Sequence, residues 1–259
     1  MINIDKAIEE FKVYIKPFRA TEEVGFALKE NHTYRVMKKS KEIAEKLNLD
    51  EEDIKIAELI GLLHDIGRFE EMKVVNCFDS GKFNHAEYGV KILFEDGLIE
   101  RFTEDKEYYP IIRAAILNHS RLTIEDGLDE RALLHSKIIR DSDKIDNFEV
   151  KINYKAEHLF KNIVNSEKEF ENSAISDKVY DAVMNEKCVI LSDRKTPLDY
   201  FVTILGFVYD IYFKESYEII KQNNYINRLI DRFDYKVLET KDKIENMRQV
   251  LNNWIDKNI

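Results

Sequence analysis

The sequence predicts an all-α fold. The chain has 259 residues but only 8 glycines and 3 prolines, against an average usage of roughly 7% and 5%. Sandwiches, barrels and doubly wound sheets need many tight turns, which consume both residue types. Apolar residues also recur at helical spacing in nearly every segment. These observations favour a bundle of long helices with few connections, in a chain long enough to bury a sizeable core.

The first predicted helices bring histidines to the ends of apolar faces. His32 heads a face that continues through Val36, Ser40, Ile43, Ala44 and Leu47. Asp50 is expected to cap the next helix, which is apolar nearly all round over residues 54–63 and should be buried. This helix runs into His64-Asp65, and Gly67 is expected to mark its end.

Three further predicted elements follow. Residues 70–84 have weak periodicity and contain the turn signal Asp79-Ser80-Gly81. A helix from about His85 is expected to stop at Gly97, and another places His119 on one face with Ile112, Ala115 and Ile116. A fifth helix runs from about Asp129 through Asp143.

Beyond Val150 the pattern stays helical. Thr196-Pro197 is a cap followed by the usual first-turn proline, and it opens an apolar helix over residues 198–213. We therefore expect a core of residues 1–150 and a helical extension of residues 151–259 packed on it. No clear linker separates them, so one continuous domain is the simplest interpretation.

Charge and composition exclude several classes of function. Acidic residues outnumber basic ones by 50 to 40, giving a net charge of −10, which disfavours binding to duplex nucleic acid through its phosphates. A local basic pocket for a small phosphorylated ligand stays compatible with this balance. Nothing in the sequence excludes assembly of the chain into a homodimer.

The chain is expected to be cytoplasmic. Cys77 and Cys188 follow no metal-binding spacing and are interpreted as reduced thiols. Acidic residues among the first ten do not suit a signal peptide. The longest apolar run, residues 201–213, contains Asp210 and is shorter than the about 20 residues that a membrane-spanning helix needs.

Four of the six histidines point to a metal site: His32, His64, His85 and His119. Imidazole is a good ligand for divalent transition metals, and a helix bundle can aim ligands from several helices at one point. Asp65 adds a carboxylate that can bridge two ions. A His-Asp pair at the end of an apolar helix, with three further histidines on other helix faces, is a strong signal for metal binding.

The segments "NHTYRVMKKSKEIAEKLNL" and "LLHDIGRFE" resemble the opening of the HD superfamily of metal-dependent phosphohydrolases. The resemblance covers residues from about 30 to 148 and implies an HD-domain-like helical bundle there, whereas the helical C-terminal extension resembles no family in this way. Its ligand order corresponds to His32, His64-Asp65, His85, His119 and a closing aspartate in "RDSDKIDNF".

Two aspartates compete for the closing position. Periodicity slightly favours Asp141, which shares a face with Leu134, Ile138 and Ile145. The resemblance favours Asp143, because the final motif of the family reads Asp-Lys/Arg-aliphatic-Asp. We follow the resemblance and keep Asp141 as a residue that supports the ligands.

The resemblance implies a site for two ions. One would be held by His32, His64, Asp65 and Asp143, and the second would share Asp65 and take His85 and His119. Two such ions lower the pKa of a bridging water and clamp phosphoryl oxygens. Imidazole-rich sites suit Mn, Fe, Zn, Co or Ni better than Mg.

Asp65 and Arg68 are the predicted catalytic residues. Arg68 follows His64 by one helical turn, and the matching residue of the family is often basic and contacts phosphate. Arg121 and Lys144 are weaker candidates for the same contact. His135, His158 and Arg35 are interpreted as structural or solvated residues.

The predicted function is a phosphomonoesterase or phosphodiesterase acting on a small phosphorylated metabolite or nucleotide. One alternative is a mixed-valent di-iron oxygenase, similar to the inositol oxygenase type, which has the same ligand order. Another is a non-catalytic HD-like binding module. Cyclic-dinucleotide phosphodiesterases of the HD-GYP type are also similar, but the chain lacks Gly-Tyr-Pro, and Asn118-His119 stands where they carry paired histidines.

Overall fold

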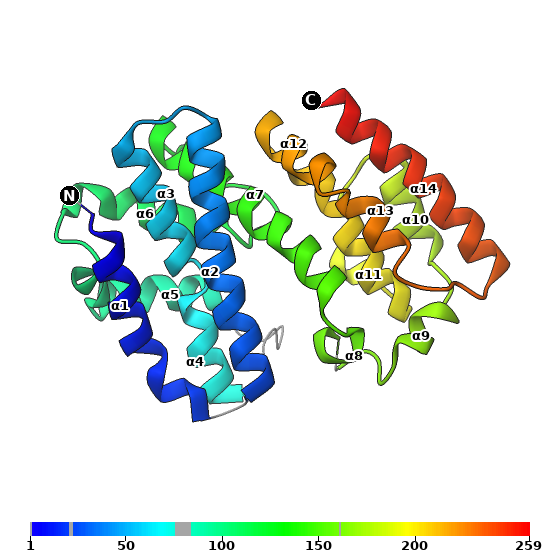
Figure 1. The fold of residues 1–259 in the computed structure, drawn as a ribbon, viewed down its shortest axis with the longest axis horizontal. Coiled ribbons are helices and arrows are strands. Elements are labelled where there is room, and N and C mark those ends of the chain that lie inside the picture. Colours follow the sequence, from blue (N-terminus) through cyan, green and yellow to red (C-terminus); the bar gives the residue numbers. More distant parts are fainter. Residues whose placement is uncertain (1, 21–22, 76–83, 161) are drawn as a thin grey trace. The chain divides into compact units, whose positions relative to one another are not determined.

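The computed structural model describes residues 2–20, 23–75, 84–160 and 162–259, which form two compact units, Met1–Asp143 and Lys144–Ile259. Regular structure among these residues is helical throughout, with no strand (Figure 1). The all-α prediction is therefore confirmed. The packing of residues 151–259 on the core stays a prediction.

The N-terminal unit is a bundle of helices joined by short 3-10 segments (Figure 1). The helices that build it are α1 (Ile4–Ile15), α2 (Glu23–Lys46), α3 (Glu51–Leu63), α4 (Ile66–Val75), α5 (His85–Val90), α6 (Tyr109–Asn118) and the first part of α7 (Glu130–Asn153). The 3-10 segments are Lys16–Ala20, Leu98–Arg101 and Lys106–Tyr108.

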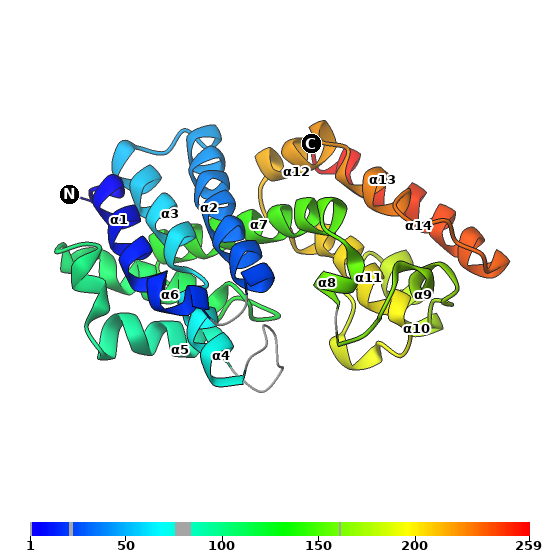
Figure 2. The same cartoon turned by 60° about the horizontal axis from the view of Figure 1, so that its bottom comes forward.

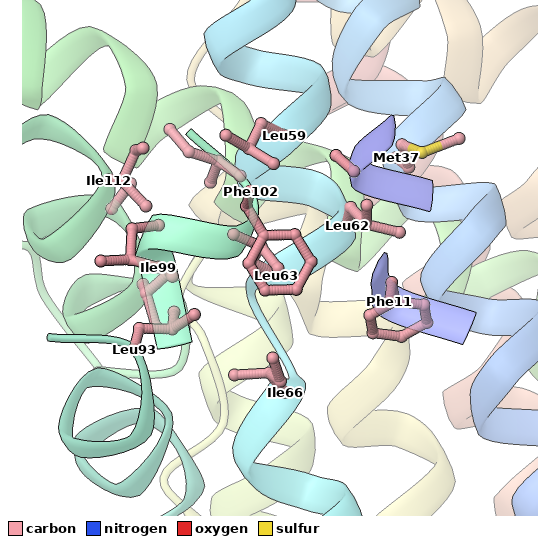
Figure 3. Packing of buried hydrophobic residues seen from close by; sticks show 14 of the residues in the cluster. Phe11, Met37, Leu59, Leu62, Leu63, Ile66, Leu93, Ile99, Phe102 and Ile112 are labelled. Atoms are coloured by element: carbon pink, nitrogen blue, oxygen red, sulfur yellow. The ribbon is translucent and has the colours of Figure 1, made fainter. Parts of the chain in front are cut away.

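Helix α3 lies at the centre of this bundle, as its apolar sequence predicts. Asp50 caps it by accepting a hydrogen bond from the Asp53 amide at 2.8 Å, and every residue from Ile56 to Leu63 is buried. Helices α1, α2 and α6 pack around it. Figure 3 shows Leu59, Leu62 and Leu63 of α3 with Phe11 and Met37 to one side and Ile99 and Ile112 to the other.

Gly67 does not end the helix that precedes it, so this prediction is wrong. Helix α3 ends at Leu63, and Gly67 lies in the first turn of α4. A Cβ atom on Gly67 would overlap the carbonyl oxygen of His85 and lie 2.8 Å from the amide nitrogen of Gly89. The glycine is therefore needed because α4 and α5 make direct backbone contact there.

The later elements follow the sequence with changes in length. Helix α4 continues to Val75, whereas the predicted turn Asp79-Ser80-Gly81 lies outside the described residues. Helix α5 passes into the π-helical turn Lys91–Glu95. This turn ends before Gly97, as predicted, and Gly97 adopts the left-handed conformation (φ 78°). Helix α6 ends at Asn118, directly before His119, and α7 extends well beyond Asp143.

The C-terminal unit is also helical (Figure 2). Beyond the end of α7 it contains α8 (Ala156–Leu159), α9 (Glu167–Glu171), α10 (Asp177–Met184), α11 (Pro197–Leu205), α12 (Lys214–Gln222), α13 (Tyr225–Ile230) and α14 (Leu238–Lys257), with 3-10 segments Leu191–Asp193 and Gly206–Asp210. Helix α14 packs against α10, α12 and α13. No helix in the described ranges is long and apolar enough to cross a membrane.

Aromatic rings form much of the C-terminal core. Phe233 stacks on Phe170 with ring centroids 5.1 Å apart and meets Phe201 edge-on at 4.9 Å. Thr196 and Asp199 form the predicted cap as a reciprocal capping box. The helix that it opens ends at Leu205, so it is shorter than predicted. Cys77 lies outside the described residues.

Candidate metal centre

The six side chains predicted as metal ligands lie together in the N-terminal unit. Each comes from a different place in the bundle: α2, the end of α3, the turn after it, the start of α5, the end of α6, and α7. They form two groups, and within each group the potential ligand atoms lie within 4.8 Å of one another. The groups are His32, His64 and Asp143, and Asp65, His85 and His119.

Asp65 lies between two pairs of histidines. Its Oδ2 atom is 3.6 Å from His32 Nε2 and 3.3 Å from His64 Nε2. Its Oδ1 atom is 3.4 Å from His85 Nε2 and 3.6 Å from His119 Nε2. One carboxylate therefore presents a separate oxygen to each pair, which is the geometry that a shared ligand of two ions needs.

Asp143, and not Asp141, belongs to this cluster. Asp143 Oδ1 lies 3.2 Å from His32 Nε2 and 4.0 Å from His64 Nε2. Residues two apart in a helix point in directions about 200° apart, so Asp141 faces another way, although it is fully buried. Apolar periodicity cannot separate the two residues, because α7 has buried positions on both sides here.

Backbone carbonyls fix the orientation of two of the imidazole rings. His64 Nδ1 lies 2.8 Å from the Gly61 carbonyl oxygen, and His119 Nδ1 lies 2.6 Å from that of Ile116. Each histidine stands at the C-terminal end of its helix, where carbonyls lack intrahelical partners. Donation from Nδ1 leaves the Nε2 lone pair directed at Asp65, as a metal-binding histidine requires.

Two buried atoms of the site lack hydrogen-bond partners among the described residues: His64 Nε2 and Asp65 Oδ1. A buried polar atom without a partner destabilises the fold by about 1–3 kcal/mol, so such atoms are rare in native proteins. In addition, His85 Nε2 and His119 Nε2 are only 3.0 Å apart. Coordination of a transition metal would satisfy these nitrogen and oxygen donors, and the residues present therefore fit a metal site.

The electrostatics keep the donors in their metal-binding forms. Burial lowers the pKa of His64 and lowers the pKa of His85 to about 2, despite the opposing charge of Asp65. Burial by itself would raise the pKa of Asp65, but the Lys29 ammonium and the histidines more than offset it, so the pKa lies well below its ordinary value. Metals bind neutral imidazole and ionised carboxylate.

Sequence reasoning missed two charged residues of the site. The Lys29 ammonium on α2 forms an ion pair with Asp65 Oδ2, and the fully buried Glu71 Oε2 lies 2.8 Å from Arg68 Nη1. Lys29 precedes His32 by one helical turn, and Glu71 follows Arg68 by one. One-turn spacing from a predicted site residue is a sequence signal for both residues, but solvated charges on a helix share this spacing, so it does not identify either one.

The predicted phosphate contacts have different surroundings. Arg68 is 15% exposed, and its Nε atom lies 3.7 Å from Asp65 Oδ1. Arg121 pairs with Glu125 in the segment after α6, and Lys144 pairs with Asp210 in the C-terminal unit. Of the three cations predicted to contact phosphate, Arg68 is therefore the one that lies beside Asp65.

The two remaining histidines lie outside the two groups of potential ligands. His135 is fully buried on α7, and its Nε2 atom lies 2.9 Å from Asp53 Oδ1. His158 is an exposed residue of α8.

Arg140 supports the segment that carries His119, a role that no sequence pattern indicated. Its buried guanidinium donates hydrogen bonds to the carbonyls of Asn118, Arg121 and Leu122 at 2.7, 2.5 and 3.2 Å. These carbonyls flank His119 at the end of α6. The guanidinium therefore fixes the backbone on both sides of this histidine.

A sequence model of the HD domain family matches residues 30–147, which include all six clustered residues. No curated protein and no solved structure gives a match. HD domains are all-helical, bind divalent metal ions and are typical of metal-dependent hydrolases. Residues 30–147 therefore form an HD domain.

Proposed function

We propose that this protein is a metal-dependent phosphohydrolase that cleaves a phosphate ester bond of a small phosphorylated substrate at a site for two divalent ions. The observation that carries the proposal is the position of Asp65 between two histidine pairs, with the cation of Arg68 beside it at 3.7 Å. The histidine pairs support metal binding, and the cation supports a substrate that bears negative charge.

The residues divide between the two ions through Asp65. His32, His64, Asp143 and Asp65 Oδ2 would hold the first ion. The second would lie with Asp65 Oδ1 and the two other histidines of the cluster. Two divalent ions in these positions would supply Lewis acidity toward water and the phosphoryl oxygens. The hydrogen bonds from the Nδ1 atoms hold the rings in place, so little reorganisation is needed during the reaction.

Arg68 would bind the phosphoryl group of the substrate. Its guanidinium is held by the fully buried Glu71, which sets its direction beside Asp65. A preorganised guanidinium can donate hydrogen bonds to phosphoryl oxygens whose charge increases in the transition state, and its planar fork matches two phosphate oxygens. In the reaction, a water oxygen bonds to phosphorus, the ester P–O bond breaks, and an alcohol leaves.

A metal panel under exclusion of oxygen tests the proposal. Purified protein is analysed for its metal content, stripped of metal and reloaded separately with Mn, Fe, Zn, Co, Ni or Mg. We expect release of phosphate or of an alcohol from phosphomonoesters or phosphodiesters with redox-inert Zn or with Mn, because hydrolysis needs no change of oxidation state. Activity that occurs only with iron and oxygen, with no phosphate ester cleaved, would contradict the proposal and favour an oxygenase.

A further inference from the structure

Lys29 places an ammonium group inside the metal cluster. It lies on α2, one turn before His32, and its side chain is only 14% exposed. Its Nζ atom contacts Asp65 Oδ2, which is the oxygen that faces His32 and His64. The positive charge of Lys29 therefore lies where the ligands of the first ion converge.

The neighbouring acidic groups already have other partners. Glu30, the next residue of α2, pairs with Arg19 at 2.7 Å, and Asp143 lies 3.2 Å from His32 Nε2. A cation that is largely buried needs an anionic partner. In the described residues the partner of Lys29 is the carboxylate that an ion would also need.

We propose that Lys29 exchanges partners. Its ammonium neutralises Asp65 in the metal-free protein and binds the phosphoryl group of the substrate in the metal-loaded protein. This inference rests on the proposed function and deepens it, because it also assigns the substrate class: a phosphomonoester that enters as a dianion.

Repulsion between like charges drives the exchange. An ammonium and a divalent ion on the same buried oxygen repel each other strongly, because little water screens them. The flexible four-carbon stem of lysine allows the ammonium to move away. Lys29 contacts Asp65 Oδ2 from α2, and Arg68 on α4 lies 3.7 Å from Asp65 Oδ1 through its Nε atom. A phosphoryl group bound at this carboxylate's ions would therefore lie close to cations from both helices.

The balance of charge favours a dianion. Asp65 and Asp143 partly neutralise the two ions, and Glu71 balances Arg68 through their contact at 2.8 Å. When the negative charge of an attacking hydroxide is also counted, the positive charge left on the site without Lys29 matches the single negative charge of a phosphodiester. Lys29 adds the charge that matches the second negative charge of a phosphomonoester. Complementary charge of this kind governs which ligands a site selects.

Calorimetric titrations of Lys29→Met test the exchange. Metal-free protein is titrated with Zn²⁺, and metal-loaded protein is then titrated with inorganic phosphate. We expect Lys29→Met to bind the first Zn²⁺ about tenfold more tightly, because a competing cation is gone. We expect it to bind phosphate about tenfold or more weakly, because a charge-assisted hydrogen bond is lost. Lys29→Arg should retain most of the phosphate affinity, and Lys38→Met, at an exposed position of α2, should change neither affinity.

Opposite changes in the two affinities separate this role from a structural one. If Lys29→Met weakens both or alters neither, the exchange is overturned. In steady-state assays, Lys29→Met should reduce kcat/KM for p-nitrophenyl phosphate by about tenfold or more and should affect bis(p-nitrophenyl) phosphate less. Equal losses of kcat/KM for the two substrates would overturn the assignment of a phosphomonoester as the substrate class. Wild-type protein that neither binds phosphate nor cleaves an ester would overturn the proposed function and the phosphate half of the exchange, while the Zn²⁺ titration would still decide the competition for Asp65.

Discussion

Gly67 of α4 lies directly against the backbone of His85 at the start of α5, so that a single methyl group there would overlap the His85 carbonyl oxygen. The contact brings the histidine of α5 beside Asp65, which precedes α4. The close backbone contact at one glycine thus determines the position of His85 among the candidate metal ligands.

Gly67→Ala should therefore destabilise the protein. Forcing α4 and α5 apart is an overpacking change, which typically costs about 1–3 kcal/mol, and urea unfolding of the metal-free protein measures it. Gly206→Ala is the matched control, because the nearest atoms to a Cβ at this position are 3.7 Å away. Similar unfolding midpoints for the two variants would contradict the inferred backbone contact.

Asp65→Ala should reduce metal content more than His119→Ala. Asp65 presents an oxygen to both histidine pairs, whereas His119 faces one of them. Elemental analysis after dialysis should find both ions lost in the first variant and one retained in the second. Full metal content in both variants would show that the ligands lie elsewhere.

Arg68→Ala should weaken phosphate binding and leave metal content intact. The loss of a charge-assisted hydrogen bond predicts about a tenfold to hundredfold weaker affinity, measured by titration of the metal-loaded protein with phosphate. Arg68→Lys should recover only part of it, because lysine lacks the planar fork.

Glu71→Gln tests how Arg68 is held. This change removes the charge that fixes the guanidinium, so it should raise KM for a phosphorylated substrate while the metal content is kept. Arg113→Ala, at an exposed position of α6, is the control. An unchanged KM in Glu71→Gln would mean that Arg68 does not depend on this contact.

The metal-free protein should lose stability as the pH falls from about 7 toward 5. Burial lowers the pKa values of His64, His85 and His135 below their ordinary 6.5. The unfolded chain then binds more protons than the folded one, and stability rises with pH through this window. The pKa values of Asp65 and Asp143 lie below the ordinary 3.8, so their contribution is lost only in stronger acid.

His135→Gln isolates one part of this pH dependence. Glutamine can still donate a hydrogen bond to Asp53 but does not titrate. The variant should show a shallower dependence of unfolding free energy on pH, by up to about 1.4 kcal/mol per pH unit. Urea unfolding at pH 7.5, 6.5 and 5.5 measures the slope. An identical slope in the variant and the wild type would mean that the pKa of His135 does not differ between the folded and unfolded states.

Much of the fold and the location of the site could be predicted from local sequence patterns. The Asp50 cap, the stop at Gly97 and the histidines at the ends of α3 and α6 are all properties of single helices. Because the four histidines stand near the ends of apolar faces, the helical period was enough to identify them, whereas Asp143 was chosen from the family resemblance. Their role in holding an ion stays a prediction.

Contacts between helices could not be predicted in this way. Glycine is common after helices, so the pattern alone gave Gly67 the wrong role, and only the approach of α5 reveals the right one. Lys29 resembles any solvated lysine until α2 is seen beside Asp65. Apolar periodicity favoured Asp141 over Asp143 because it detects burial alone. A buried position on α7 can face the cluster or pack elsewhere in the interior, and Asp141 does the latter.

The guanidinium of Arg140 also has a consequence for the order of folding. It reaches the carbonyl of Asn118 across 22 positions of sequence, so the backbone around His119 is completed only when α7 has docked. Contacts between distant segments form late, because the chain must first lose the entropy of closing the intervening loop. The ability to bind metal should therefore arise at the end of folding, after the individual helices have formed, and metal uptake during refolding would report the arrival of α7.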